Sequence, residues 1–284
     1  MTDKIIALVD GSNYSKSVCE HAAWIATRTG CGVELLHILG RREGVEKKDY
    51  SGSLALGART SLLNDLAELD AQRAQLVTHR GRAILEDAQK LVEEAGAETV
   101  TTRLRHGDIV DTVTEQEAGA EFILIGKRGE AADFAKEHLG SNLERVVRAS
   151  KKPVFAASRA FKPIDKVLVA YDGGTSSMRA VDHIARSPLY RGLDVHVVTI
   201  GTETDEVRRS LENAGAMLKA AGIEATTGVI AGKPETALPE FVDLSGYDLL
   251  VMGAYGHSRI RTLIIGSTTT EMLRTCKVPV VLVR

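Results

Sequence analysis

A glycine-rich segment in the C-terminal half of the chain has the spacing of an anion-binding loop. Gly253 and Gly256 are separated by two residues, and nine further residues separate Gly256 from the pair Gly266-Ser267, which Thr268 follows. Glycines let backbone N–H groups approach a phosphate closely, and a Gly-Ser turn that opens a helix aims unpaired N–H groups at it. The spacing predicts a phosphate site. The structural alternative is that the glycines only make tight strand-to-helix turns.

A less regular copy of this loop lies in the N-terminal half. Gly126 and Gly129 are again separated by two residues, but ten residues precede Gly140-Ser141, one more than in the other half. The copy holds the basic residues Lys127, Arg128 and Lys136 and the acidic residues Glu130, Asp133 and Glu137. The basic side chains could meet a phosphate, whereas the acidic ones would repel it. We therefore expect the C-terminal half to be the stronger anion binder.

Two aspartates and two histidines also recur in the two halves. Asp10 and Asp172 each follow a short apolar run, where a carboxylate could bind a ligand, help to hold Mg²⁺, or cap the next turn. His21 and His183 recur within helical segments, where packing is the more common role. The chain has no HExxH motif, no GxxxxGK[ST] loop and no GxGxxG loop after the first strand. We predict no catalytic residue.

These residues recur because the chain repeats itself. Residues 4–11, which read KIIALVDG, match residues 166–173, which read KVLVAYDG, and residues 122–126 match residues 249–253. Further matches near positions 107 and 232, and near 152 and 278, keep the same order. Such ordered similarity indicates a tandem duplication. We expect one domain over residues 1–158 and a second over 164–284.

Each half predicts five strands that alternate with helices. Short continuous apolar runs indicate strands buried on both faces, as in parallel sheets covered by helices. The runs are 5–9, 33–39, 122–125 and 154–157, then 167–170, 195–200, 249–252 and 280–283, with weaker strands at 100–105 and 224–230. A helix is expected over residues 15–29. The pattern predicts an α/β fold of two tandem doubly wound, Rossmann-like domains, each with a five-stranded parallel sheet.

The N-terminal half carries an insertion at about residues 41–95. It begins with a segment at 41–59 and continues as a long helix that starts near Ser61. One face of that helix carries the leucines Leu62, Leu63, Leu66 and Leu69. We expect this face to pack on the core. The alternative for the preceding segment is a lid or a docking site, because long loops in compact domains are often functional.

Composition sets the remaining limits. The 284 residues suit two domains at roughly 150 residues each, and the formal net charge is −2. A balanced charge gives no global attraction to nucleic acid or anionic lipid, and no apolar run approaches the ~18 residues of a transmembrane helix. Cys19, Cys31 and Cys276 lack CxxC spacing, so neither a disulfide framework nor a thiolate metal site is indicated. We expect a cytoplasmic protein without nucleic-acid or membrane partners.

The duplicated α/β unit, the aspartate after the first strand and the Gly-x2-Gly-x9-Gly-Ser loop resemble the universal stress protein family over essentially the whole chain. The resemblance implies a cleft for ATP or AMP, with Mg²⁺ as a candidate accompanying ion. It implies adenine near Ala170, Tyr171, Asp172 and Ile200, and ribose and phosphates near Met252, Gly253, Tyr255, Gly256, Gly266, Ser267 and Thr268. The N-terminal half departs from the pattern, and its corresponding residues are Asp10, Ile38, Gly126, Gly129, Gly140 and Ser141.

The resemblance also implies a role and an arrangement of the halves. The leading hypothesis is a stress-response regulator that binds adenine nucleotide and thereby alters its conformation or its contacts with a protein partner. A nucleotide-free scaffold and a slow ATPase are the alternatives. The last strands of the two halves, 153–157 and 279–283, are expected to pair antiparallel across a pseudo-twofold axis. One chain would then imitate a dimer, and a homodimer of whole chains would use another surface.

Overall fold

A computed structural model describes residues 4–40, 58–129, 140–254 and 267–284. The first half of the chain forms β1 (Lys4–Leu8), α1 (Ser15–Thr29), β2 (Gly32–Leu39), α2 (Ala58–Glu94), β3 (Val100–His106), α3 (Ile109–Gln116), β4 (Ala120–Gly126), α4 (Ser141–Ala149) and β5 (Val154–Ala157). The second half forms β6 (Lys166–Ala170), α5 (Thr175–Arg186), the short 3-10 helix η2 (Pro188–Tyr190), β7 (Asp194–Ile200), α6 (Asp205–Ala220), β8 (Ala225–Ile230), α7 (Pro234–Leu244), β9 (Leu249–Gly253), α8 (Ser267–Thr275) and β10 (Val280–Val283). No helix within these described ranges has the length and apolar content needed to cross a bilayer.

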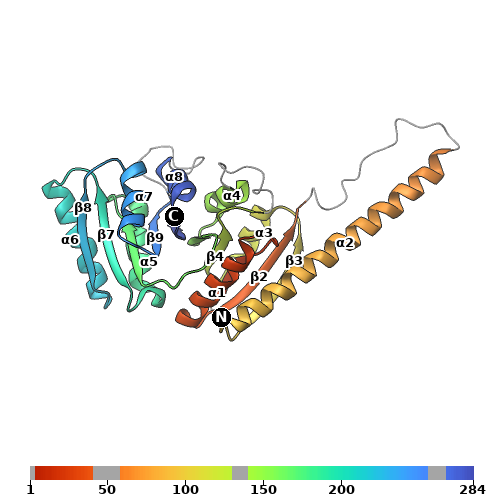
Figure 1. Ribbon diagram of the computed structural model, residues 1–284, viewed down its shortest axis with the longest axis horizontal. Helices are drawn as coiled ribbons and strands as arrows, with labels where there is room; N and C mark the ends of the chain where they lie inside the picture. The colour runs from red at the N-terminus through yellow and green to blue at the C-terminus, as the bar shows by residue number, and fades with distance from the viewer. Residues whose placement is uncertain (1–3, 41–57, 130–139, 255–266) are drawn as a thin grey trace.

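The strands form one ten-stranded sheet with a mirrored order, β3-β2-β1-β4-β5-β10-β9-β6-β7-β8 (Figure 1). Within each half all pairings are parallel, which confirms the doubly wound α/β prediction. The halves meet where β5 and β10 pair antiparallel, with Val281 opposite Phe155. This pairing confirms the expected junction and leaves neither apolar final strand as an open edge.

The strands are buried on both faces, and this explains their continuous apolar sequences. In β1, Ile5 and Ala7 belong to the core beneath α1, α2, α5 and α6, whereas Ile6 and Leu8 belong to the core beneath α3, α4, α7 and α8. Alternate side chains of a strand point to opposite faces, so an apolar residue is needed at each position. The sheet therefore has a helical layer on each side.

The two recurrent histidines pack at the junction between the halves. The ring of His21 lies 5.1 Å from that of Phe155 in β5, and the ring of His183 lies 5.0 Å from that of Phe122 in β4 (centroid distances). Burial lowers the pKa of each imidazole to about 4. In both rings Nε2 is buried and has no hydrogen-bond partner. The packing role expected for these histidines is confirmed.

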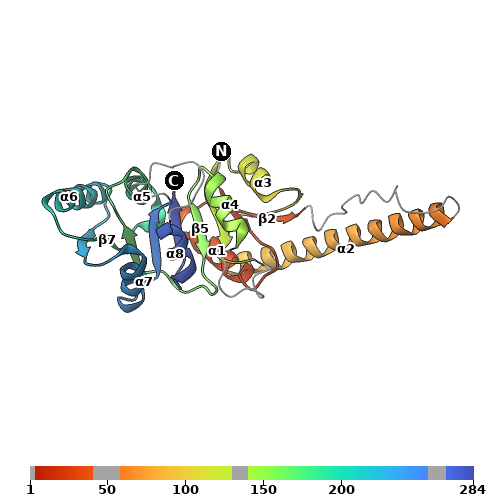
Figure 2. The ribbon, with the colours of Figure 1, turned by 90° about the horizontal axis from the view of Figure 1, so that it is seen from above.

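Helix α2 differs from the sequence-based expectation. It starts at Ala58 instead of near Ser61, and Leu62 and Leu69, expected in the core, are 40% and 61% exposed. Figures 1 and 2 both show the N-terminal part of α2 projecting away from the body of the protein. Only the C-terminal part, with Leu85, Ala88 and Val92, enters the core. The prediction of a core-packed leucine face was therefore wrong.

The counterpart of α2 in the other half explains where packing stops. When the ends of the two helices are matched, Asp205 at the start of α6 corresponds to His79, and Ile84 corresponds to Ser210. The match is structural as well, because Ile84 lies against Gly11 and Ser210 lies against Gly173, the equivalent glycine. The part of α2 before His79 therefore has no counterpart in α6, and we call it the N-terminal extension of α2.

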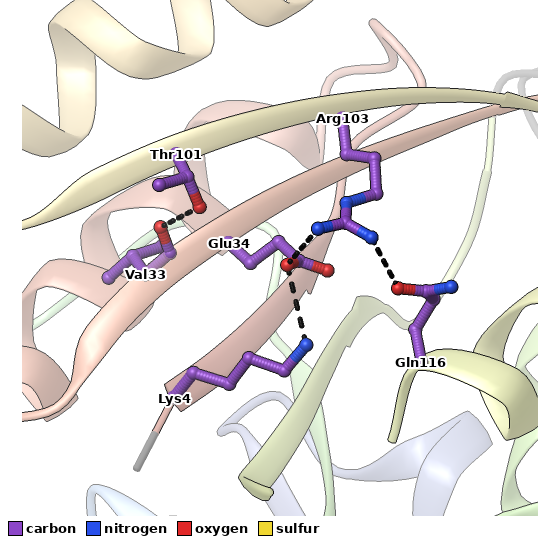
Figure 3. Close-up of polar contacts among 6 residues, drawn as sticks. All are labelled: Lys4, Val33, Glu34, Thr101, Arg103 and Gln116. Atoms are coloured by element: carbon purple, nitrogen blue, oxygen red, sulfur yellow. Dashed lines mark hydrogen bonds and ion pairs between the residues drawn. The ribbon is translucent and has the colours of Figure 1, made fainter. Parts of the chain in front are cut away.

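A buried carboxylate links three strands on the opposite face of the first half (Figure 3). Glu34 of β2 lies 3.3 Å from Lys4 Nζ of β1 and 3.3 Å from Arg103 of β3, measured at Glu34 Oε2. Arg103 also donates to Gln116 Oε1 of α3 at 2.6 Å. A carboxylate that is only 7% exposed needs such cations to offset its lost hydration.

Candidate functional site

Three neighbouring parallel strands end at one edge of the second half. The order β9-β6-β7 places the carboxyl ends of these strands side by side, and ligands of open α/β sheets bind at that edge. Ala170 ends β6, Ile200 ends β7 and Gly253 ends β9, and all three are half-buried. Met252 lies almost buried beneath them. The fold thus brings together four residues that the resemblance assigns to the nucleotide site: Ala170 and Ile200 for adenine, and Met252 and Gly253 for ribose and phosphates.

Ile230 is a further apolar residue at this edge of the sheet, and no sequence motif indicated it. It ends β8, it is half-buried, and with Ala170 and Ile200 it packs on the core beneath α7 and α8. In the register of β7 and β8, Ile230 lies directly beside Ile200. Its position as the last apolar residue of the weaker predicted strand, 224–230, was the sequence feature that could have indicated it. Ala170, Ile200 and Ile230 thus form a row of half-buried apolar residues at the ends of β6, β7 and β8, which we call the apolar floor.

Asp172 organises the loop that follows β6. Its Oδ1 accepts hydrogen bonds from the backbone N–H of Gly174 at 2.8 Å and from the Ser177 hydroxyl at 2.6 Å. Asp10 Oδ1 does the same with Ser12 N–H at 3.0 Å and Ser15 Oγ at 3.1 Å. Of the three roles considered for these aspartates, turn capping is therefore present in both halves. The caps hold each loop at the carboxyl edge of the sheet.

Tyr171 lies at the carboxyl edge of the sheet with its backbone, whereas its ring is in the core. Its side chain is 3% exposed, and its hydroxyl is 2.9 Å from Ser210 Oγ of α6. Its N–H donates to the Val198 carbonyl, and its carbonyl accepts from the Thr199 hydroxyl. The aromatic ring is thus a core element on the α5 and α6 side of the sheet.

The glycines that end β4 and β9 are required by packing. A Cβ added to Gly253 would lie 2.7 Å from Ser176 Cβ, and one added to Gly126 would lie 2.7 Å from Tyr14 Cβ. Real side-chain carbons do not approach so closely, so only glycine lets the strand end pass the start of α5 or α1. The structural alternative for the first glycine of each loop therefore holds, and it does not exclude ligand contact by the backbone.

An acidic residue that no sequence motif indicated, Glu235, lies beside the start of α8. Thr268, in the first turn of α8, donates its hydroxyl to Glu235 Oε1 at 3.0 Å. Glu235 lies in the first turn of α7, where a carboxylate interacts favourably with the helix dipole. The Thr268 hydroxyl is thus engaged by this carboxylate, and the contact of Thr268 with ribose or phosphate stays a prediction. Ser267 begins α8 as the loop pattern requires, whereas Tyr255, Gly256 and Gly266 lie outside the described residues.

The first half assembles its own loop ends. Gly140 donates its N–H to the Lys127 carbonyl at 3.3 Å and precedes α4, which starts at Ser141. A Cβ added to Gly129 would lie 2.9 Å from Asp10 Oδ2, so the loop passes directly beside that carboxylate. Ile38, the counterpart of Ile200, is likewise half-buried at the end of β2.

The side chain of Lys127 is directed to the second half of the chain. Its ammonium donates to the carbonyl oxygens of Cys276 at 2.6 Å and Val278 at 2.7 Å, in the turn before β10. Burial lowers the pKa of its amine to about 8. The expectation that Lys127 could meet a phosphate is wrong, because its side chain joins the two halves of the sheet. Lys136 lies outside the described residues.

Across the described residues, no group of three or more His, Cys, Asp or Glu side chains is arranged to hold a metal ion. Burial raises the pKa of the Cys19 thiol to about 12, so this cysteine stays protonated near neutral pH.

A mirrored α/β sheet with capped loops at its carboxyl edges defines a tandem protein of the doubly wound class. The sequence profile of the Universal stress protein family matches residues 1–157 and 200–284. The chain belongs to the universal stress protein family.

Relatives agree with this assignment along the whole chain. Universal stress protein Slr1230 from Synechocystis is 35% identical over 285 aligned residues, covering 99% of both chains. The crystal structure of a universal stress protein from Archaeoglobus fulgidus covers 100% of this chain and 99% of its own, with a TM-score of 0.75 and 22% identity, and so shares the fold. A universal stress protein solved in complex with cAMP is 30% identical and covers 43% of this chain and 98% of its own, with a TM-score of 0.38.

Proposed function

We propose that this protein binds an adenine nucleotide, ATP or AMP, in the second-half cleft and acts as a stress-response regulator through nucleotide-dependent conformation or partner contacts. The observation that carries the proposal is the convergence of Asp172, Ile200 and Gly253 at neighbouring strand ends, with the start of α8 at Ser267. The apolar floor suits adenine, and the N–H groups at the start of a helix suit phosphate. The resemblance of the loop to the nucleotide-binding branch of the family supports the same ligand.

The proposal is asymmetric. In the first half the loop is one residue longer and carries three acidic residues, and Lys127 is committed to the junction. The ammonium of Lys127 is therefore directed to the turn before β10 and not to the carboxyl edge of the first half. We propose that the first half acts mainly as a scaffold and that the second half holds the nucleotide. The two domains that we propose are residues 1–158 and residues 164–284.

Ligand released from the purified, denatured protein and identified by mass spectrometry tests the proposal first. AMP or ATP in near-stoichiometric amount is expected. Titration calorimetry with ATP, AMP and cAMP, each with and without Mg²⁺, then ranks the ligands. Absence of bound nucleotide together with no heat for any of the three would contradict it.

A matched pair of variants assigns the cleft. Ile200→Glu and Ile38→Glu place the same charge at equivalent half-buried floor positions of the two halves. Ile200→Glu is expected to weaken ATP binding by at least tenfold, because a carboxylate at the floor would repel phosphate and disfavour the apolar ring. Ile38→Glu is expected to leave ATP binding within about twofold of the unmodified protein, because the first half is not the proposed site. Equal losses in both variants would contradict the asymmetry.

A further inference from the structure

The N-terminal extension of α2 carries an exposed apolar stripe. Among the described residues there are five large exposed apolar side chains, and three of them, Leu62, Leu69 and Leu76, lie on this helix at 40%, 61% and 71% exposure. They follow one another at seven-residue spacing, so they lie along one line of the helix, which exposed Ala83 continues. We call Leu62, Leu69, Leu76 and Ala83 the α2 stripe.

Nothing within the described part of the chain covers this stripe. From Leu62 to Arg80 no described side chain is buried, and Gly81, which passes His37 and Leu104, is the first buried residue of the helix. Exposed leucines that recur every two turns along one line of a projecting helix form a surface that a partner can bury. Figure 2 shows the extension projecting beyond both helical layers.

The charges of α2 between Leu62 and Ala83 are segregated by sign. Acidic residues come first, at Asp65, Glu68 and Asp70, and basic residues follow, at Arg73 in the extension and at Arg80 and Arg82 just beyond it. Two such helices side by side in parallel would place like charges together. In the antiparallel arrangement each acidic segment meets the basic segment of its partner, which is favourable.

The stripe and the charges share one twofold axis. An axis between Gln72 and Arg73 places Leu69 level with Leu76 of a second copy and Leu62 level with its Ala83. The same axis places Asp65 level with Arg80. A twofold interface requires each surface to be complementary to itself, and the α2 stripe and the Asp65–Arg80 pair meet this requirement.

We propose that two copies of this chain associate through antiparallel pairing of their α2 extensions along the α2 stripe. This surface is separate from the β5–β10 junction, which is already used within the chain. The paired stripe spans about 32 Å, at 1.5 Å per helical residue. An interface of one helix pair lies at the small end of the stable range, so dissociation on the order of micromolar is expected. The proposal does not depend on nucleotide binding.

Sedimentation velocity of the full chain between about 1 and 100 µM tests the association. We expect a concentration-dependent dimer that is lost in Leu69→Glu/Leu76→Glu and kept in the control Leu244→Glu, whose side chain is 87% exposed on α7. Because these positions are exposed, the variants keep the fold, and circular dichroism verifies it. A monomer throughout, or a dimer unaffected by the double substitution, overturns the proposal.

Orientation is tested by spin-label distances in separate Gln72→Cys and Asn64→Cys variants. The antiparallel axis predicts a short interchain distance at position 72 and an axial offset of about 26 Å between the two copies of position 64. Charge reversal gives a second readout, because Asp65→Arg is expected to weaken the dimer and added Arg80→Asp to restore it. Short distances at both positions indicate parallel pairing and overturn the proposal.

Discussion

Lys127 in the loop after β4 donates to the carbonyl oxygen of Val278, just before β10, at 2.7 Å. Its second bond, to the Cys276 carbonyl, lies within the same turn. The two halves are thus joined by a buried side chain as well as by the β5–β10 ladder.

Lys127→Ala should lower the free energy of unfolding by about 2 kcal/mol, since two carbonyls lose their donor. Urea unfolding measures this loss, and the exposed control Lys151→Ala should stay within about 0.5 kcal/mol. Equal stability of the two variants would show that the junction does not need Lys127.

The histidines at the junction predict acid sensitivity. His21 and His183 have folded-state pKa values lowered by burial from 6.5 to about 4, so the unfolded chain binds more protons between those values. The contribution of the buried neutral imidazoles to the stability of the folded protein is fully present above pH 6.5 and is lost as the pH falls toward 4. At pH 5 each should contribute a loss of about 2 kcal/mol relative to pH 7. His21→Phe/His183→Phe should flatten the dependence of the urea midpoint on pH. An unchanged slope in the double variant would refute this assignment.

The centre of β10 tests the strand junction. Val281 lies between Phe155 of β5 and Val251 of β9, so it is flanked by a strand on each side. Val281→Pro removes its N–H and inserts a ring, with an expected cost of about 3 kcal/mol or more. Limited proteolysis of the segment between β5 and β6 should accelerate. Val281→Thr keeps the N–H and the branched shape, and should protect that segment better than proline does. Identical cleavage rates would mean that the ladder does not hold the halves together.

The buried carboxylate of Figure 3 predicts a modest, local contribution. Glu34→Gln keeps the shape but removes the charge between Lys4 and Arg103. Both cations are partly exposed and can regain water, so we expect a loss of about 1–2 kcal/mol in chemical unfolding. The comparison variant is Glu203→Gln, whose pairing with Arg208 is exposed on both sides and should be worth less than about 0.5 kcal/mol. A larger effect at Glu203 would contradict the role of burial.

The sequence was sufficient for the sheet because its strands are buried on both faces. Runs such as residues 154–157 and 280–283 have the composition that β5 and β10 require, and the duplication fixes their equivalence. Helix α1 was predicted with its observed bounds because its apolar spacing and the following Gly30 mark both ends. Local patterns suffice where the environment of a segment is uniform.

Local patterns failed where the partner lies far away in the chain. The leucines of α2 have core-like spacing, yet nothing local tells whether a sheet lies beneath them. Lys127 stands in a glycine-rich loop, but its acceptors come from the turn before β10. The link between Thr268 and Glu235 likewise joins two helix starts that only the fold brings together. Each of these required the tertiary arrangement.

Titration calorimetry of ATP against the ligand-free full chain tests the central claim most directly. One nucleotide per chain is expected, with Ile200→Glu abolishing most of the heat and Ile38→Glu retaining it. Two equal sites per chain, or loss confined to Ile38→Glu, would contradict asymmetric binding in the second-half cleft.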